Sequence, residues 1–262
     1  ICRILGSPPP AGFIYELFLD ENGEKISKSR GNGLTIDEWL SYGSHESLSL
    51  YMFATPRRAK RLHFDVIPRH VDDYFSHLEK FAKLGQAEQR ENQVWHIHAG
   101  QQPQPEAGIS YAILRNLASV CNTEDPSVLW GFISRYAPDA APETTPILDQ
   151  LVALAINYYR DFVKPDKHYR QPDAIEAKAL EELISVFKAL PEDATAADIQ
   201  SEVYEIGKRH GFENLRDWFK ALYEILLGQE QGPRMGSFIA LYGLSETVAL
   251  IRRALAGEDL AA

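Results

Sequence analysis

Cysteine is nearly absent from this chain of 262 residues: Cys2 and Cys121 are the two that occur, and they lie far apart. Two cysteines without a paired spacing support neither a disulfide framework nor a cysteine-based zinc site, and they suit a reducing cytosol. Apolar runs long enough to span a bilayer are also missing from the sequence, as is a basic-then-apolar secretory leader. We therefore expect a soluble, cytoplasmic protein without a membrane partner.

An initiator methionine is also lacking, because the sequence opens on Ile1. We interpret the chain as a piece of a longer protein. Its hydrophobic fraction of 45% is enough for packed cores in one large domain or two to three small ones. The net charge of −10 argues against a protein that coats nucleic acid indiscriminately, although it says nothing about local patches.

Positive charge gathers between Lys25 and Phe64, where seven cations stand against three acids, a net charge of plus four. This region begins with Lys25-Ile-Ser-Lys-Ser29, which Arg30-Gly-Asn-Gly33 follows at once. Ammonium and hydroxyl groups beside small residues can approach a polyanion closely, so the segment predicts phosphate chemistry. Asn22-Gly23 is a two-residue hairpin signal after the strand-like residues 15–20, and we expect the lysines to hang from that hairpin.

The same region ends in a basic run, whose cations are Arg57, Arg58, Lys60 and Arg61. If these side chains are exposed together, their field attracts a phosphate backbone without reading its sequence. An isolated run of this kind is more often a solvated edge paired with nearby acids. Its position shortly after the lysine–serine segment favours RNA binding.

Helix signals follow the loop. Thr35 and Glu38 form a capping-box pattern, Ser44 can cap a second helix, and Pro68 can open a third. Residues 94–98 alternate like a strand and place two histidines on one face. A third metal ligand is not evident there, and the same holds for His70 and His77, so we expect no metal site.

The sequence from residue 101 onwards is typical of helices. Residues 101–107 are polar and rich in proline, and we expect the main joint between domains there. We expect Thr195 and Asn214 to cap helices and Gly211 and Gly228 to end them. No repeat of constant period is visible, which favours an irregular bundle. The helices we expect cover residues 109–121, 127–136, 148–162, 173–190, 196–208, 215–227, 236–242 and 245–255.

The segment Lys25–Ser29 resembles the KMSKS signature of class I aminoacyl-tRNA synthetases, with Ile26 in the methionine position. The longer run of residues 15–33 resembles the corresponding stretch of class I lysyl-tRNA synthetases. So do residues 33–40, 54–61 and 231–238. The signature alone would fit many class I synthetases, and these longer runs are what point to lysine.

The resemblance implies the C-terminal portion of such an enzyme, with ATP, taken with Mg²⁺, as a substrate. Lys28 would meet the pyrophosphate leaving group and Lys25 would support it, while Ser27 and Ser29 would also contact ATP. A prepositioned ammonium stabilises the charge that builds on departing pyrophosphate more than it stabilises the ground state. The residues before Lys25 are too few for the family's nucleotide-binding domain, which also holds the lysine pocket. We therefore expect this chain alone to be inactive in lysyl-adenylate formation.

The resemblance also implies a mainly α fold in three parts. Residues 1–33 would end the catalytic region with the KISKS loop on its hairpin. Residues 34–100 would form a small α/β region that contacts the tRNA stem, and residues 101–262 an irregular all-helical cage that binds the anticodon of tRNA(Lys). Arg234 is the charged candidate for RNA contact in the cage, and no DNA partner is expected. The aromatic candidates for base stacking, none favoured individually, are Trp130, Tyr158, Tyr159, Trp218 and Phe219.

Three other interpretations stay open. The chain can be a stand-alone tRNA- or RNA-binding module that has kept the loop as a phosphate contact. It can be part of a related glutamyl-type class I synthetase. A helical protein-interaction scaffold is the third, but it leaves the cations between Lys25 and Arg61 without a purpose.

Overall fold

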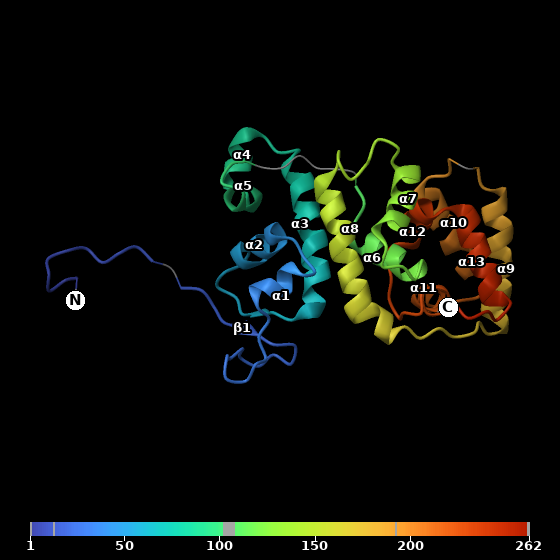
Figure 1. Ribbon diagram of the computed structural model, residues 1–262, viewed down its shortest axis with the longest axis horizontal. Coiled ribbons are helices and arrows are strands. Elements are labelled where there is room, and N and C mark those ends of the chain that lie inside the picture. Colours follow the sequence, from blue (N-terminus) through green and yellow to red (C-terminus); the bar gives the residue numbers. More distant parts are fainter. Residues whose placement is uncertain (1, 13, 102–107, 192, 261–262) are drawn as a thin grey trace. The chain divides into compact units, whose positions relative to one another are not determined.

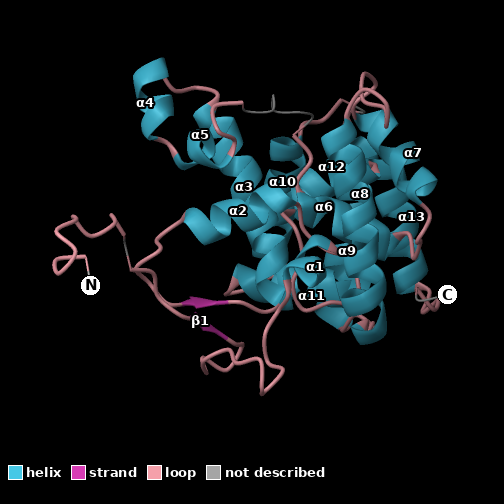
Figure 2. Ribbon diagram, turned by 60° about the vertical axis from the view of Figure 1, so that its left-hand side comes forward, coloured by secondary structure: helices cyan, strands magenta, loops and turns pink. Residues whose placement is uncertain are grey.

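The computed structural model describes residues 2–12, 14–101, 108–191 and 193–260, and it divides into two compact units. Unit 1 comprises Ile1–Gln104 and unit 2 comprises Pro105–Ala262. Both consist mainly of helices, and a sheet of two short strands lies in unit 1 (Figures 1 and 2). The prediction of a mainly α fold is confirmed. Residues 102–107, which hold most of the expected joint, lie outside the described residues.

Among the residues that the structure describes, no helix combines the length and the apolar character that crossing a membrane requires.

The KISKS segment sits on a hairpin, as predicted. Strand β1 (Phe18–Leu19) ends before a turn in which Gly23 has a φ of +82°, and Leu19 forms an antiparallel bridge with Lys25. Gly23 occurs here because residues with a side chain rarely adopt a positive φ. The strand is shorter than residues 15–20 suggest, and Tyr15 is 71% exposed.

A second strand, β2 (Lys60–Arg61), pairs in parallel with β1, in the register Phe18 to Lys60 and Leu19 to Arg61. The backbone N–H of Leu62 donates to the carbonyl of Leu19 at 2.7 Å and extends the ladder. Figure 2 draws the two strands side by side. This pairing fixes the basic run next to the hairpin that carries the lysines.

The predicted helix starts of unit 1 are confirmed. The Thr35 hydroxyl accepts from the backbone of Glu38, whose carboxylate accepts in return from the backbone N–H of Thr35. Ser44 caps the next helix, and Pro68 lies in the first turn of the long one. The helical elements are α1 (Ile36–Leu40), α2 (His45–Phe53), the 3₁₀ turn η1 (Phe64–Val66), α3 (Ile67–Phe81), α4 (Gln86–Glu91) and α5 (Gln93–Ile97).

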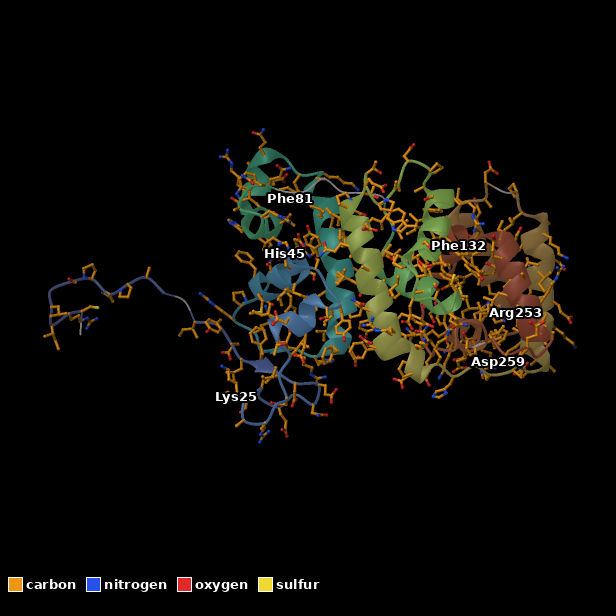
Figure 3. All side chains as sticks on the ribbon, viewed as in Figure 1. Lys25, His45, Phe81, Phe132, Arg253 and Asp259 are labelled. Carbon is orange, nitrogen blue, oxygen red and sulfur yellow. The ribbon has the colours of Figure 1, made fainter. Side chains whose placement is uncertain are left out.

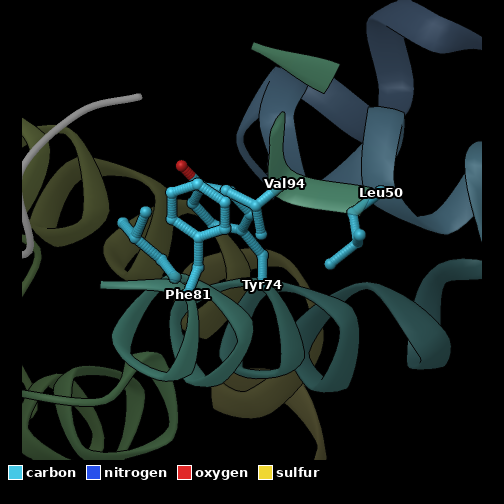
Figure 4. Close-up of a cluster of buried hydrophobic side chains, with 5 residues drawn as sticks. Leu50, Tyr74, Phe81 and Val94 are labelled. Atoms are coloured by element: carbon cyan, nitrogen blue, oxygen red, sulfur yellow. The ribbon is translucent and has the colours of Figure 1, made fainter. Parts of the chain in front are cut away.

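An apolar cluster holds α2, α3 and α5 together. Figure 4 shows Leu50 from α2, Tyr74 and Phe81 from α3 and Val94 from α5 converging on it. Trp39 of α1 is fully buried nearby, and its indole N–H donates to the Ser47 hydroxyl at 3.2 Å. Burial of such side chains contributes about 1.5–3 kcal/mol each, so this cluster holds the three helices firmly against one another.

The predicted strand at residues 94–98 is wrong, because Gln93–Ile97 form α5. Asn92 is the reason: its side-chain oxygen accepts from the backbone N–H of Val94 at 2.9 Å and caps a helix. The two histidines have ordinary packing partners. His98 is 3.0 Å from the Tyr74 hydroxyl, and the ring of His96 stacks on Phe53.

Unit 2 is a helical bundle, and its helices follow the predicted ranges closely. Thr195 and Asn214 cap helices as predicted, and Gly211 and Gly228 end them with φ values of +77° and +67°. Helix α6 contacts α8, α9 contacts α13, and α10 contacts α12. The α-helices are α6 (Tyr111–Val120), α7 (Pro126–Tyr136), α8 (Pro146–Tyr158), α9 (Ala174–Ala189), α10 (Ala196–Arg209), α11 (Leu215–Leu226), α12 (Met235–Tyr242) and α13 (Leu244–Leu255).

The sequence suggested an α-helix as far as residue 162, but α8 ends at Tyr158. It passes into a π-helical turn, η2 (Tyr159–Val163), and then into a 3₁₀ turn, η3 (Lys164–Asp166). Pro165 lies in the 3₁₀ turn and lacks the backbone N–H that a continuing helix needs.

Candidate nucleotide- and RNA-binding site

The two lysines of the KISKS loop are exposed on the hairpin of unit 1, where Figure 3 labels Lys25. The loop turns tightly at its centre, because the backbone N–H groups of Arg30 and Gly31 both donate to the carbonyl of Ser27. The hydroxyls of Ser27 and Ser29 lie 2.8 Å apart. The structure thus brings the four predicted ATP-contacting residues, Lys25, Ser27, Lys28 and Ser29, onto one short turn with both ammonium groups open to solvent.

Two residues that the sequence reasoning missed hold this loop. Asp20 is buried, and one of its carboxylate oxygens accepts from the backbone N–H groups of Asn22 and Glu24 at 3.0 and 2.8 Å. Its other oxygen accepts from the Asn32 amide at 2.7 Å. Asn32 in turn accepts from the backbone N–H of Ser27 at 3.0 Å. An aspartate two residues before Asn-Gly is a recognisable turn signal that could have identified Asp20.

These hydrogen bonds favour the ionised carboxylate. The bond from Asn32, followed by the one from the Glu24 backbone, holds the pKa of Asp20 below its usual range. A pKa that is lower in the folded state stabilises the fold at pH values above the usual range of aspartate. That stabilisation is lost as the pH falls through the lowered pKa. The Asp20–Asn32 clamp is therefore intact at neutral pH.

Replacing Asn32 by alanine is expected to loosen the loop. The variant removes the amide that donates to one carboxylate oxygen of Asp20, and it also removes the acceptor of the Ser27 backbone N–H. Local opening, and with it limited tryptic cleavage after Lys28 or Arg30, should become roughly tenfold faster or more. Asn22→Ala, at an exposed position of the same hairpin, is the control. Equal cleavage rates in the two variants would contradict the role of the clamp.

The basic run divides into two kinds of residue. Arg57, Arg58 and Arg61 are exposed. Lys60 is not, because its ammonium donates to the carbonyls of Tyr51 and Met52 at 2.5 and 3.2 Å, in the last turn of α2. There it satisfies carbonyls that have no partner within the helix, and burial lowers the pKa of Lys60. Three of the four predicted RNA-contacting cations thus face solvent, while the fourth caps a helix.

A cavity of about 350 Å³ lies beside β2 in unit 1. Arg61 and Lys60 line one side of it, and His70, Asp73 and His77 of α3 line another. The imidazole of His70 faces the ring of Tyr51 at a centroid distance of 4.4 Å, and burial lowers the pKa of His70. Arg61 is the exposed cation of this lining, because the ammonium of Lys60 is bound to α2, and Asp73 adds an acid opposite it.

The aromatic candidates of unit 2 fill its core. Trp218 is fully buried, Tyr159 is 1% exposed, and Tyr158 and Trp130 are 6% and 7% exposed. Their polar groups also have internal partners: the indole N–H of Trp218 donates to the carbonyl of Val203, and that of Trp130 donates to Asp149. Phe219 is half-buried against Tyr204. Four of these five rings are therefore too buried to stack on a base, because burying large aromatic surface stabilises the bundle.

Arg234 is exposed at the residue that precedes α12, as the sequence suggested for a helix-to-helix turn. It lines a cavity of about 260 Å³ together with the start of α6 and the end of α7.

The chain is similar to known proteins over nearly its whole length. The family described as "tRNA synthetases class I (K)" matches residues 1–101. A lysine–tRNA ligase of Rickettsia bellii is 53% identical over 97% of this chain and 49% of its own length. One from Roseobacter denitrificans is 54% identical over 99% of this chain and 49% of its own length. The chain thus spans about half the length of the curated relatives it matches.

Proposed function

Since this chain belongs to the class I lysyl-tRNA synthetase family, over about half of its relatives' length, we propose that it forms the part of a lysine–tRNA ligase that contacts ATP and holds tRNA. Lys28, supported by Lys25, would stabilise the pyrophosphate that leaves when the lysine carboxylate attacks ATP. Ser27 and Ser29 would hold the triphosphate, which enters with Mg²⁺. The lysine pocket would lie in the part of the relatives that this chain does not span.

The observation that carries this proposal is the pairing of β1 with β2. It joins two segments that are far apart in sequence, the KISKS hairpin and the basic run, and both present exposed cations. A lysine–tRNA ligase needs its ATP-contacting loop close to the tRNA, because the activated lysine is transferred to that tRNA. Two neighbouring cationic segments support this arrangement better than a lone phosphate-binding loop would.

We also propose the division of labour along the chain. Residues 1–33 would serve the ATP site, residues 34–100 the tRNA stem and residues 101–262 the anticodon of tRNA(Lys). Such an enzyme works in translation, so the cytoplasm is its proposed location, and neither DNA nor a membrane is among its proposed partners.

Arg57→Ala combined with Arg58→Ala is expected to weaken tRNA binding by the 262-residue chain. Each phosphate contact that is lost should reduce the slope of log affinity against log salt by roughly one, so the double variant should lose about two. Fluorescence anisotropy with labelled tRNA(Lys), measured between about 50 and 200 mM salt, gives this slope. Lys80→Ala with Lys83→Ala, near the end of α3, is a charge-matched control. An unchanged slope in the arginine variant would remove the basic run from the proposed interface.

The anticodon assignment has its own test. The chain should bind tRNA(Lys) more tightly than the same tRNA with its anticodon bases changed. Indifference to those bases would remove this part of the proposal, and a preference for a glutamate anticodon would point to the related glutamyl-type enzyme instead.

A further inference from the structure

Two cavities of unit 2 meet at one exposed tyrosine. Tyr136, the last residue of α7, is 49% exposed and lines both the cavity of about 260 Å³ at Arg234 and a larger one of about 1020 Å³. The larger cavity extends over α12 to the end of α9 and the start of α10. In Figures 1 and 2, α7 and α10 lie beside α12, which contacts both of them. The volume of the larger cavity is at the upper end of the range for small-ligand sites.

The exposure of Tyr136 is unusual for this bundle. Among the described residues of unit 2, the exposed tyrosine, tryptophan and phenylalanine side chains are Tyr136 and Tyr204, at 49% and 42%. Tyr204 contacts Phe219 and lines neither cavity. An exposed aromatic ring at the rim of two cavities is a surface on which an unpaired base can stack. Its exposure lowers the stability of the fold, because a ring buried in the core would contribute more.

The charge around Tyr136 selects the kind of ligand. Residues 105–262 carry fifteen cations and twenty-four acids, so unit 2 as a whole repels a polyanion. The two cavities differ from that average. Their lining holds four cations, Arg135, Lys188, Arg234 and Arg252, against two acids, Asp193 and Glu246.

One of these acids is already neutralised. The carboxylate of Glu246 accepts from the guanidinium of Arg135 at 2.6 Å. The exposed cations that remain outnumber Asp193: Arg234 lines the smaller cavity, and Lys188 and Arg252 line the larger one. A strand of RNA that passes over the ring could place phosphates on both sides of it.

We propose that Tyr136 is a stacking platform for an unpaired base of an RNA loop, with Arg234 binding the adjoining phosphate. The inference rests on the proposed anticodon function and names the residues that perform it. Stacking on a tyrosine tolerates any base, so Tyr136 supplies affinity for single-stranded RNA rather than base identity.

The test uses the 262-residue chain and an RNA hairpin with the lysine anticodon loop, in which 2-aminopurine replaces a loop adenine. Stacking on Tyr136 should quench the 2-aminopurine emission. Tyr136→Ala should weaken binding roughly tenfold and abolish the quenching, since stacking contributes about a factor of ten per base. Tyr136→Phe keeps the aromatic ring, so it should retain both the binding affinity and the quenching. Tyr204→Ala is the matched control, an exposed tyrosine outside the cavities, and should behave as the unchanged chain.

Salt dependence separates the two named residues. Arg234→Ala should reduce the salt slope of hairpin binding by roughly one, whereas Tyr136→Ala should leave the slope unchanged. A fully paired RNA duplex offers no free base, so Tyr136→Ala should bind it as well as the unchanged chain does.

The failures are distinguishable. If the unchanged chain does not bind the hairpin, the anticodon function itself is wrong. If it binds while Tyr136→Ala, shown by circular dichroism to be folded, binds equally and still quenches, the platform is overturned and the proposed function stands.

Discussion

Replacing Lys28 by alanine is expected to slow lysine-dependent pyrophosphate exchange by about 10²–10³-fold in an enzyme of the relatives' full length that carries this chain. Lys28 is exposed on a turn whose ends are held by Asp20 and Asn32, so its ammonium is available to a triphosphate. Negative charge develops on pyrophosphate as the bond to the α-phosphorus breaks, and no other group on the turn would replace the lost cation fully. The loss should therefore fall mainly on the rate constant and less on the KM for ATP.

Two further variants make this result specific. Lys28→Arg keeps the charge but changes its shape and reach, so it should recover part of the rate. Lys80→Ala removes an exposed cation near the end of α3 and should leave the rate unchanged. An undiminished exchange rate in the Lys28→Ala enzyme would show that the loop lysine plays no part in the chemistry.

The second large effect concerns Gly236 in α12. A Cβ atom at this position would lie 2.1 Å from the carbonyl oxygen of Ala196 and 2.8 Å from the backbone nitrogen of Gln200. Both neighbours are backbone atoms of α10, so no side-chain rotation can make room. Gly236→Ala must push α12 away from α10, and we expect the free energy of unfolding to fall by about 3 kcal/mol.

Gly131 is the matched control, because it lies within α7 and a Cβ atom there would meet nothing within 4 Å. Gly131→Ala should stabilise the chain by about 0.5–1 kcal/mol, since alanine loses less backbone entropy in a helix. Thermal unfolding followed by circular dichroism compares the two. Gly236→Ala should lower the Tm by about 6–12 °C, whereas Gly131→Ala should raise it slightly. A Tm for Gly236→Ala at or above that of the unchanged chain would refute the close helix approach.

Local signals in the sequence predicted local structure well. Thr35 with Glu38, Ser44 and Thr195 each cap the helix that their spacing indicated, because a cap depends on atoms a few residues apart. The same reasoning failed at residues 94–98. Five alternating residues fit one turn of helix as well as a strand, and the capping oxygen of Asn92 decides between them.

Long-range features were beyond sequence reasoning. The pairing of β1 with β2 involves two residues on each strand, which is too short for any periodic pattern. The amino-acid composition also does not show whether a cationic side chain faces solvent or binds within the protein. Lys60 and Arg61 are neighbours in the basic run, yet the first caps α2 and the second is exposed. The sequence also did not separate the buried from the exposed aromatic candidates of unit 2, since a ring in the core and a ring at the surface occur at the same helical spacing.

The Asp20–Asn32 clamp limits how far the KISKS loop can move. The backbone of Ile26 is hydrogen bonded to Phe18, and Asn32 is bound to both Asp20 and the backbone of Ser27, so the four residues 28–31 are left to move between two anchors. An extended residue adds about 3.5 Å, so the middle of this segment can lie no more than about 10 Å from either anchor. A larger displacement of the loop toward a nucleotide would require the whole hairpin to rotate about β1. The ladder with β2 would then carry the arginines along with it.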